Sequence, residues 1–201
     1  MLRVGLTGGL ASGKSFVGKT LAELGCTLIQ ADVLGHQVLL AGGGAYDGVL
    51  AEFGRDILDV SGEIDRRKLA TLVFDFPERL KRLNELVHPC VYQMEEDLAA
   101  AAFEKDPAGI VVVEAAILIE TGSYKRFDRL IVAICTEEQQ LARAMHRDGF
   151  TLEEAKARLS RQMPLAEKRK YADYVIDTSS TKENTIQQTR QVYESLRSVP
   201  V

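Results

Sequence analysis

The sequence predicts an α/β fold in which a five-stranded parallel sheet is flanked by helices, and three observations support this prediction. First, five short apolar runs are each followed by a polar residue and a helical pattern, as is typical of buried parallel strands. Second, a glycine-rich segment joins the first run to the first helix. Third, the helical block between the second and third runs is much longer than a simple crossover requires. The expected strands are residues 3–7, 27–31, 110–115, 129–135 and 174–177.

The glycine-rich segment matches the pattern G-x-x-x-x-G-K-[ST] in full, from Gly8 to Ser15. Glycines let the backbone fold closely around phosphate oxygens, while backbone N–H groups and the N-terminus of a helix expected over residues 14–24 supply positive potential. Lys14 adds an ammonium, and the Ser15 hydroxyl is expected to hold Mg²⁺. A glycine-rich turn with an incidental Lys-Ser pair is the alternative, and the strand before it and the helix after it favour a nucleotide phosphate site. The residues expected at this site are Gly8, Gly9, Ala11, Ser12, Gly13, Lys14, Ser15 and Phe16.

Two carboxylates follow predicted strands, at the edge where such sheets open onto a ligand. Asp32 follows the second strand, where a phosphotransferase needs a carboxylate to accept or orient an acceptor hydroxyl; the alternative is an N-cap for a helix starting at Val33. Glu114 ends the third apolar run and resembles the carboxylate that completes a Mg²⁺ site in phosphate-loop proteins. A solvated charge is the alternative for Glu114.

The remaining helices predict two specialised parts of one domain. Residues 32–107 form a helical insertion for a second substrate, with helices over 33–40, 46–53, 67–74 and 77–103, the last opening on Pro77. Residues 139–171 form a lid containing most of two helices, 137–147 and 152–162. The core comprises residues 1–31, 108–138 and 172–201, with a final helix over 183–196.

The predicted lid is rich in basic residues. Residues 143–170 carry eight basic and four acidic side chains, a local net charge of +4 in a chain whose total is −4. Arg143 and Arg147 are four residues apart, so one helix face presents both to the same anion. A lid of this kind neutralises charge in phosphoryl transfer; the alternative is an ordinary solvated helix face.

Composition limits the other function classes. The chain has 201 residues, of which 46% are hydrophobic and 27% charged, close to the average for soluble globular proteins. The net charge of −4 gives no general attraction to nucleic acid or to an anionic membrane, and no apolar stretch is long enough for a membrane helix. The three cysteines have no metal-ligand spacing. We therefore expect a cytoplasmic protein with no nucleic-acid or membrane partner, as a monomer or weak homo-oligomer.

The ordered set of motifs resembles the dephospho-coenzyme A kinase family over nearly the whole chain. The residues that carry the resemblance are 6–15, Ala31-Asp32, 57–66, Leu69, Phe74, Leu83-Asn84, His88-Pro89, Arg147-Asp148-Gly149, Arg158, Gln162-Met163-Pro164, Lys168 and 172–176. The resemblance implies that ATP, with Mg²⁺, phosphorylates the ribose 3′-hydroxyl of dephospho-coenzyme A. It also implies catalytic roles for Lys14, Asp32, Arg143 and Arg147, and metal contacts from Ser15 and Glu114.

Three positions differ from the family's pattern. Gln30 stands where the family often has a second carboxylate, Phe16 replaces a threonine after the Lys-Ser pair, and Glu114 replaces an aspartate. The closest rival is another phosphate-loop kinase acting on a nucleoside or a shikimate-like alcohol. A GTP-dependent switch is a weaker one, because Asn184 stands where the guanine-reading motif needs an aspartate.

Overall fold

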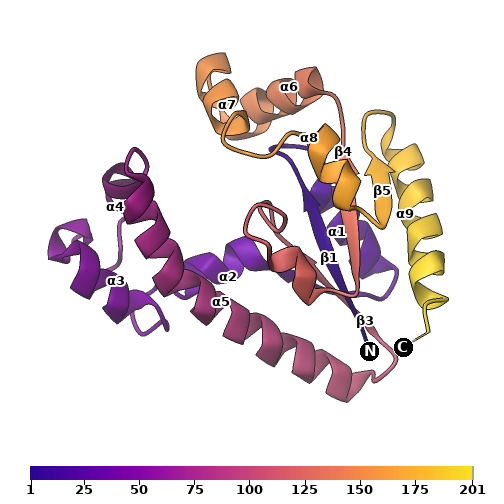
Figure 1. The fold of residues 1–201 in the computed structure, drawn as a ribbon, viewed down its shortest axis with the longest axis horizontal. Helices are drawn as coiled ribbons and strands as arrows, with labels where there is room; N and C mark the ends of the chain where they lie inside the picture. The colour runs from indigo at the N-terminus through magenta and orange to yellow at the C-terminus, as the bar shows by residue number, and fades with distance from the viewer. Residues whose placement is uncertain (201) are drawn as a thin grey trace. The chain divides into compact units, whose positions relative to one another are not determined.

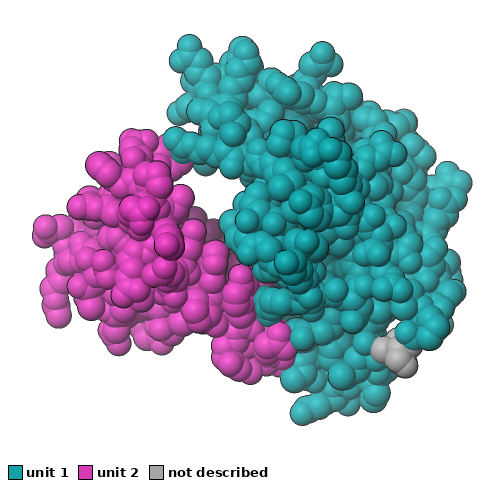
Figure 2. Space-filling model, in the orientation of Figure 1, with its two compact units in different colours: residues 1–30, 99–201 teal, residues 31–98 magenta. Residues whose placement is uncertain are grey.

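The computed structural model describes residues 1–200 and divides them into two compact units. One unit contains Met1–Gln30 and the chain from Ala99 onward, and the other is Ala31–Leu98 (Figure 2). The first unit holds the whole sheet and the phosphate motif. The second unit is helical.

The sheet contains five parallel strands, which confirms the predicted fold class (Figure 1). The strands are β1 (Leu2–Gly8), β2 (Thr27–Gln30), β3 (Ile110–Glu114), β4 (Arg129–Ile134) and β5 (Tyr174–Asp177), in the spatial order β2-β3-β1-β4-β5. β1 is therefore central. Because Leu6 pairs with Glu114 and Gly8 with Ala133, the phosphate motif leaves the middle of the sheet beside the ends of both neighbouring strands.

One large core cluster lies between the sheet and two helices, α1 (Lys14–Glu23) and α9 (Lys182–Arg197). Leu6, Val17 and Leu21 are fully buried in it. Side chains alternate between the two faces of a strand and recur every three to four residues on one face of a helix. The inward-facing side chains of β1 and of α1 therefore meet in this layer. This packing anchors both elements that flank the phosphate motif.

The helices α6 (Glu137–Asp148) and α7 (Leu152–Leu159) pack against each other within the sheet-containing unit. A capping box starts each helix, at Thr136 and at Thr151. The threonine hydroxyl accepts from the backbone N–H three residues later, and the side chain of that later residue accepts from the threonine N–H. The predicted helix over 152–162 is too long, because the chain leaves α7 at Ser160. Residues 160–164 lead instead into a short helix that the sequence did not predict, α8 (Leu165–Lys168), followed by η3 (Arg169–Tyr171).

The helical unit contains α2 (Ala31–Gln37), α3 (Tyr46–Phe53), η1 (Arg55–Ile57), α4 (Arg66–Val73) and the first part of α5 (Pro77–Lys105). Asp65 caps α4 by accepting hydrogen bonds from the N–H groups of Arg67 and Lys68. The predicted helix over 33–40 begins earlier, at Ala31, and ends at Gln37.

A further short helix, η2 (Ser123–Arg126), lies between β3 and β4 in the sheet-containing unit. Among residues 1–200, no helix has both the length and the apolarity needed to cross a membrane.

Candidate functional site

The phosphate motif forms a tight loop between β1 and α1. Ser12 N–H donates to the Gly9 carbonyl (3.2 Å), and the N–H groups of Phe16 and Val17 donate to the Gly13 carbonyl at 3.0 and 3.2 Å. Gly13 has φ +87°, and Ala11 has φ +50°, the single positive value among the described non-glycine residues. A left-handed conformation is costly for alanine, so the loop holds Ala11 against its own preference, as functional sites often do.

Glycine at the start of the loop leaves room for close neighbours. A Cβ on Gly9 would lie 2.3 Å from Gln140 Nε2, and one on Gly8 would lie 2.7 Å from the Ala133 carbonyl oxygen. A side chain at Gly8 would therefore press on backbone, whereas one at Gly9 would displace the Gln140 amide.

A cleft of about 510 Å³ opens beside this loop. The phosphate loop, the starts of α1 and α9, α6 and the segment after β5 line it, with Ala11, Ser12, Gly13, Lys14, Ser15, Phe16, Arg143, His146, Arg147, Thr178, Ser180, Lys182 and Thr185. Of the predicted nucleotide residues, the structure therefore gathers six in one cleft together with both predicted arginines. Gly8 and Gly9 lie in the same loop just before them. Four of the lining side chains are lysines or arginines, so the cleft suits a polyanion.

Arg143 is anchored on the chain beyond β5. It donates from Nη1 to Thr178 Oγ1 (3.0 Å) and from Nη2 to the Thr178 carbonyl oxygen (2.7 Å). Thr178 Oγ1 in turn donates to the Ser12 carbonyl oxygen (2.8 Å). One buried threonine thus connects the arginine to the phosphate loop.

Arg147 lines the same cleft but has a different partner. Its Nε and Nη2 donate to the two oxygens of Asp148, at 2.7 and 2.8 Å, and its side chain is 62% exposed. The paired guanidinium lowers the pKa of the Asp148 carboxyl. Arg147 thus lines the cleft while held in a bidentate pair with Asp148.

Ser15, Glu114 and Gln30 form a row of hydrogen-bonded side chains at the start of α1 and the ends of β3 and β2, and Glu114 is the buried member. Ser15 Oγ donates to Glu114 Oε1 (2.5 Å), and Gln30 Nε2 donates to Glu114 Oε2 (3.1 Å). Glu114 is 5% exposed, so a solvated charge is the wrong alternative for this residue. The departure at Gln30 has a local reason, because a carboxylate there would face Glu114 with a like charge whereas an amide donates to it.

The first half of the loop is held from α6 and from the chain after α7. Gln140 Nε2 donates to the Leu10 carbonyl oxygen, and Leu10 N–H donates to Gln162 Oε1, each at 2.7 Å. Ala11 also packs in a small buried cluster with Ala144 of α6 and Ala155 of α7. The segment predicted as a lid is therefore in direct contact with the phosphate loop.

Asp32 lies in the helical unit, in the first turn of α2 and two residues after the end of β2. The alternative as an N-cap is wrong, because α2 already begins at Ala31. The side chain is exposed. On the same unit, Arg66 Nη1 lies 3.4 Å from His36 Nδ1, and burial together with Arg66 lowers the pKa of His36 while Asp32 opposes the shift. Asp32, His36 and Arg66 thus form one electrostatic group.

The helical unit also carries a groove of about 590 Å³ along one face of α5. Its lining combines apolar, charged and amide side chains: Pro77, Leu80, Lys81, Asn84, Glu85, His88, Pro89 and Tyr92. The His88 and Tyr92 rings lie 5.9 Å apart at their centroids. All of these lining residues belong to α5, so the groove is open to solvent.

Sequence reasoning missed several residues that shape the loop. Gln140, Thr178 and Glu120 carry no local pattern that marks them, because their partners are more than 40 positions away or are backbone atoms. Lys168 belongs to the basic segment 143–170, for which a solvated helix face is the alternative to a lid. That alternative is wrong for Lys168, because the structure buries it completely. No group of three or more potential metal-ligating side chains occurs among residues 1–200.

A phosphate loop at the centre of a parallel sheet, with anchored arginine facing it across a cleft, defines a P-loop kinase. A family model described as Dephospho-CoA kinase matches residues 2–184. A dephospho-CoA kinase from Aquifex aeolicus is 41% identical over 200 residues, which is 100% of both chains. The chain therefore belongs to the dephospho-CoA kinase family.

Solved structures agree in fold. A protein from Thermus thermophilus has a TM-score of 0.82 at 30% identity, and a dephospho-CoA kinase from Campylobacter jejuni has 0.62 at 27% identity. Each comparison covers 96% of both chains.

Proposed function

We propose that this protein transfers the γ-phosphate of ATP to the 3′-hydroxyl of the ribose of dephospho-coenzyme A, yielding coenzyme A and ADP, the last step of coenzyme A biosynthesis. The observation that carries the proposal is the basic cleft, which Lys14 of the phosphate loop and Arg143 of α6 line together in a chain from this family. A kinase needs such a cleft because phosphoryl transfer depends mainly on positioning and on charge stabilisation.

In this proposal the loop amides hold the phosphates, and Lys14 bridges the β- and γ-phosphates. Phe16 supplies no hydroxyl, and its N–H is engaged with the Gly13 carbonyl. Arg143 stabilises charge on the transferring group from its anchor on Thr178, and Arg147 joins it by leaving Asp148. Arginine in this role contributes roughly 10³-fold or more to the rate.

Magnesium fits the oxygen atoms that the structure brings together. The Ser15 hydroxyl and the Glu114 carboxylate lie side by side, and hard oxygen donors are the ligands that Mg²⁺ prefers. Two protein oxygens suffice, because Mg²⁺ usually keeps several waters and takes its remaining ligands from substrate phosphates. When bound, the ion would neutralise phosphate charge, and Gln30 would keep the Glu114 carboxylate oriented through its amide.

We propose that Asp32 orients or deprotonates the acceptor hydroxyl, and that the helical unit binds the acceptor. Asp32 lies in the first turn of α2, so the carboxylate belongs to the unit that would bind the acceptor. The exposed carboxylate is available as a base or an orienting acceptor. We further propose that the protein acts in the cytoplasm, as a monomer or weak homo-oligomer, without nucleic-acid or membrane partners.

An ADP-release assay across acceptors tests the proposal. Purified protein receives ATP or GTP with dephospho-coenzyme A, a nucleoside, shikimate or no acceptor. We expect ADP release that requires dephospho-coenzyme A and Mg²⁺. Turnover with a nucleoside or shikimate but not with dephospho-coenzyme A would support another small-molecule kinase, and GTP hydrolysis without an acceptor would support a switch protein.

A further inference from the structure

Lys168 is a lysine without solvent exposure, at the end of α8. Its Nζ lies 3.2 Å from the Gly8 carbonyl oxygen, 2.7 Å from the Ala116 carbonyl oxygen and 2.9 Å from Glu120 Oε1. An ammonium has three N–H donors, so these three acceptors use all of them. One side chain therefore joins the first residue of the phosphate motif to the chain that follows β3.

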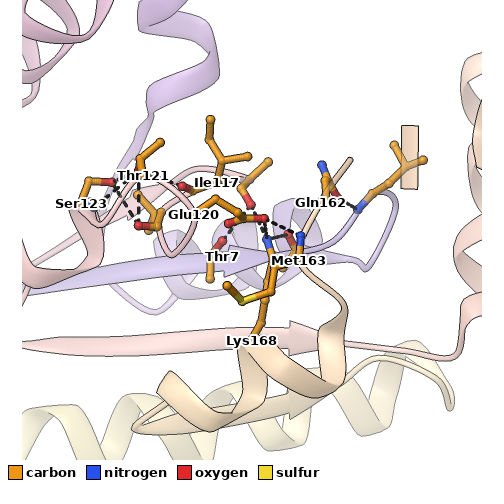
Figure 3. A network of polar contacts seen from close by, with 12 residues as sticks. Thr7, Ile117, Glu120, Thr121, Ser123, Gln162, Met163 and Lys168 are labelled. Carbon is orange, nitrogen blue, oxygen red and sulfur yellow. Dashed lines mark hydrogen bonds and ion pairs between the residues drawn. The ribbon is translucent and has the colours of Figure 1, made fainter. Parts of the chain in front are cut away.

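The same network continues toward the phosphate loop through the segment after α7 (Figure 3). Glu120 Oε1 also accepts from the Met163 N–H (3.0 Å), and the neighbouring Gln162 accepts from Leu10 N–H. The Ala116 carbonyl receives a second bond from Thr7 Oγ1 (3.2 Å). The start of the loop is thus fixed at Thr7, Gly8 and Leu10 by residues far away in the sequence.

Stability alone is a weak reason for this arrangement. Burial of an ammonium is expensive, and well-packed apolar residues often replace a buried ion pair without loss of stability. Desolvation lowers the pKa of Lys168, whereas the Glu120 carboxylate opposes the shift. The positive charge of Lys14 lowers it further.

We propose that Lys168 is a positioning residue for the nucleotide phosphates: its ammonium fixes the Gly8 carbonyl at the start of the loop and ties it to Ala116 and Glu120 in the chain after β3. This inference rests on the proposed ATP site and not on the identity of the acceptor. A bound triphosphate would then meet a loop that is already ordered. Glu120 holds the ammonium in place, and its carboxylate balances the ammonium charge.

The test compares three variants by nucleotide binding. Lys168→Met removes the buried charge and its donors. Lys170→Met is the matched control, because Lys170 is an exposed lysine two residues away, paired with Glu167. Glu120→Gln keeps an oxygen acceptor for Lys168 and Met163 but removes the negative charge. Dissociation constants for ATP and ADP are measured by calorimetry on protein whose folding is checked by circular dichroism.

We expect Lys168→Met to weaken ATP and ADP binding about tenfold, with the KM for dephospho-coenzyme A within about twofold of the parent. Lys170→Met and Glu120→Gln should bind ATP as tightly as the parent or more tightly. If Lys168→Met does not fold, Lys168→Gln, which keeps two N–H donors without a charge, takes its place.

The inference is overturned if a folded Lys168 variant binds ATP like the parent, or if Glu120→Gln or Lys170→Met loses as much affinity. It also fails if the KM values for both substrates rise together, as a merely structural role would produce. A parent protein that binds ATP but does not phosphorylate dephospho-coenzyme A would refute the proposed function and leave the binding comparison for Lys168 intact.

Discussion

Replacing Thr178 with valine removes one hydroxyl from the phosphate site and keeps the shape of the side chain. Thr178 is 5% exposed, and its Oγ1 both donates to the Ser12 carbonyl (2.8 Å) and accepts from Arg143 Nη1 (3.0 Å). In the valine variant the Ser12 carbonyl loses its donor, and Arg143 keeps only its bond to the Thr178 backbone oxygen. A buried polar group left unpaired costs about 1–3 kcal/mol.

From this cost we expect Thr178→Val to lower the melting temperature by about 2–12 °C, at about 2–4 °C per kcal/mol for a chain of this size. The kcat/KM for ATP should fall about tenfold or more, because the loop and the arginine lose their shared anchor. Thermal unfolding and steady-state kinetics measure the two effects.

Thr178→Ser is the matched control, because it keeps the hydroxyl and removes the methyl group. Loss of one buried methyl costs about 1 kcal/mol, so this variant should lose some stability but keep most of its activity. A valine variant that is as active as the serine variant would refute the role of the hydroxyl.

Three further predictions address other parts of the account. Gly9→Ala displaces the Gln140 amide, which donates to the Leu10 carbonyl, so we expect ATP binding to weaken about tenfold by calorimetry, and wild-type affinity would refute this role of Gln140. Asp32→Asn should leave ATP binding unchanged and reduce kcat by ~10²-fold or more, and an unchanged kcat would refute the assigned role. Burial raises the pKa of Cys26 to about 12, so the folded thiol stays neutral while the unfolded thiol ionises near its ordinary value. The free energy of unfolding of the parent, minus that of Cys26→Ala, should therefore be constant below about pH 8.5 and then fall by about 1.4 kcal/mol per pH unit. Urea unfolding of both proteins from pH 7 to 11 measures this difference, and a constant difference would disprove the prediction.

The sheet and the phosphate loop were predictable because both depend on local signals. Apolar runs mark buried parallel strands, and the motif from Gly8 to Ser15 requires its own backbone conformation. Boundaries were less accurate: α2 begins at Ala31, although the apolar pattern of β2 extends to that residue. An apolar run indicates which residues are buried, and buried residues continue beyond the last residue that pairs with the neighbouring strand. The run therefore does not fix where the strand ends.

The contacts that hold the site were not predictable, because they depend on which distant residues meet. Lys168 belongs to a basic segment, and only the family resemblance singles it out from Lys170; no charge or hydropathy pattern shows that one is buried and the other exposed. Their fates differ because Lys168 reaches two backbone carbonyls and Glu120 together. Only tertiary structure creates that set of acceptors.

The central claim is the transfer of phosphate to one hydroxyl, and the product tests it most directly. Dephospho-coenzyme A and ATP are incubated with the protein and Mg²⁺, and the purified product is examined by ³¹P and ¹H NMR. The account predicts one new phosphate monoester at the ribose 3′ position, formed in equal amount to ADP. A phosphate at another position, or ADP without a phosphorylated acceptor, would contradict it.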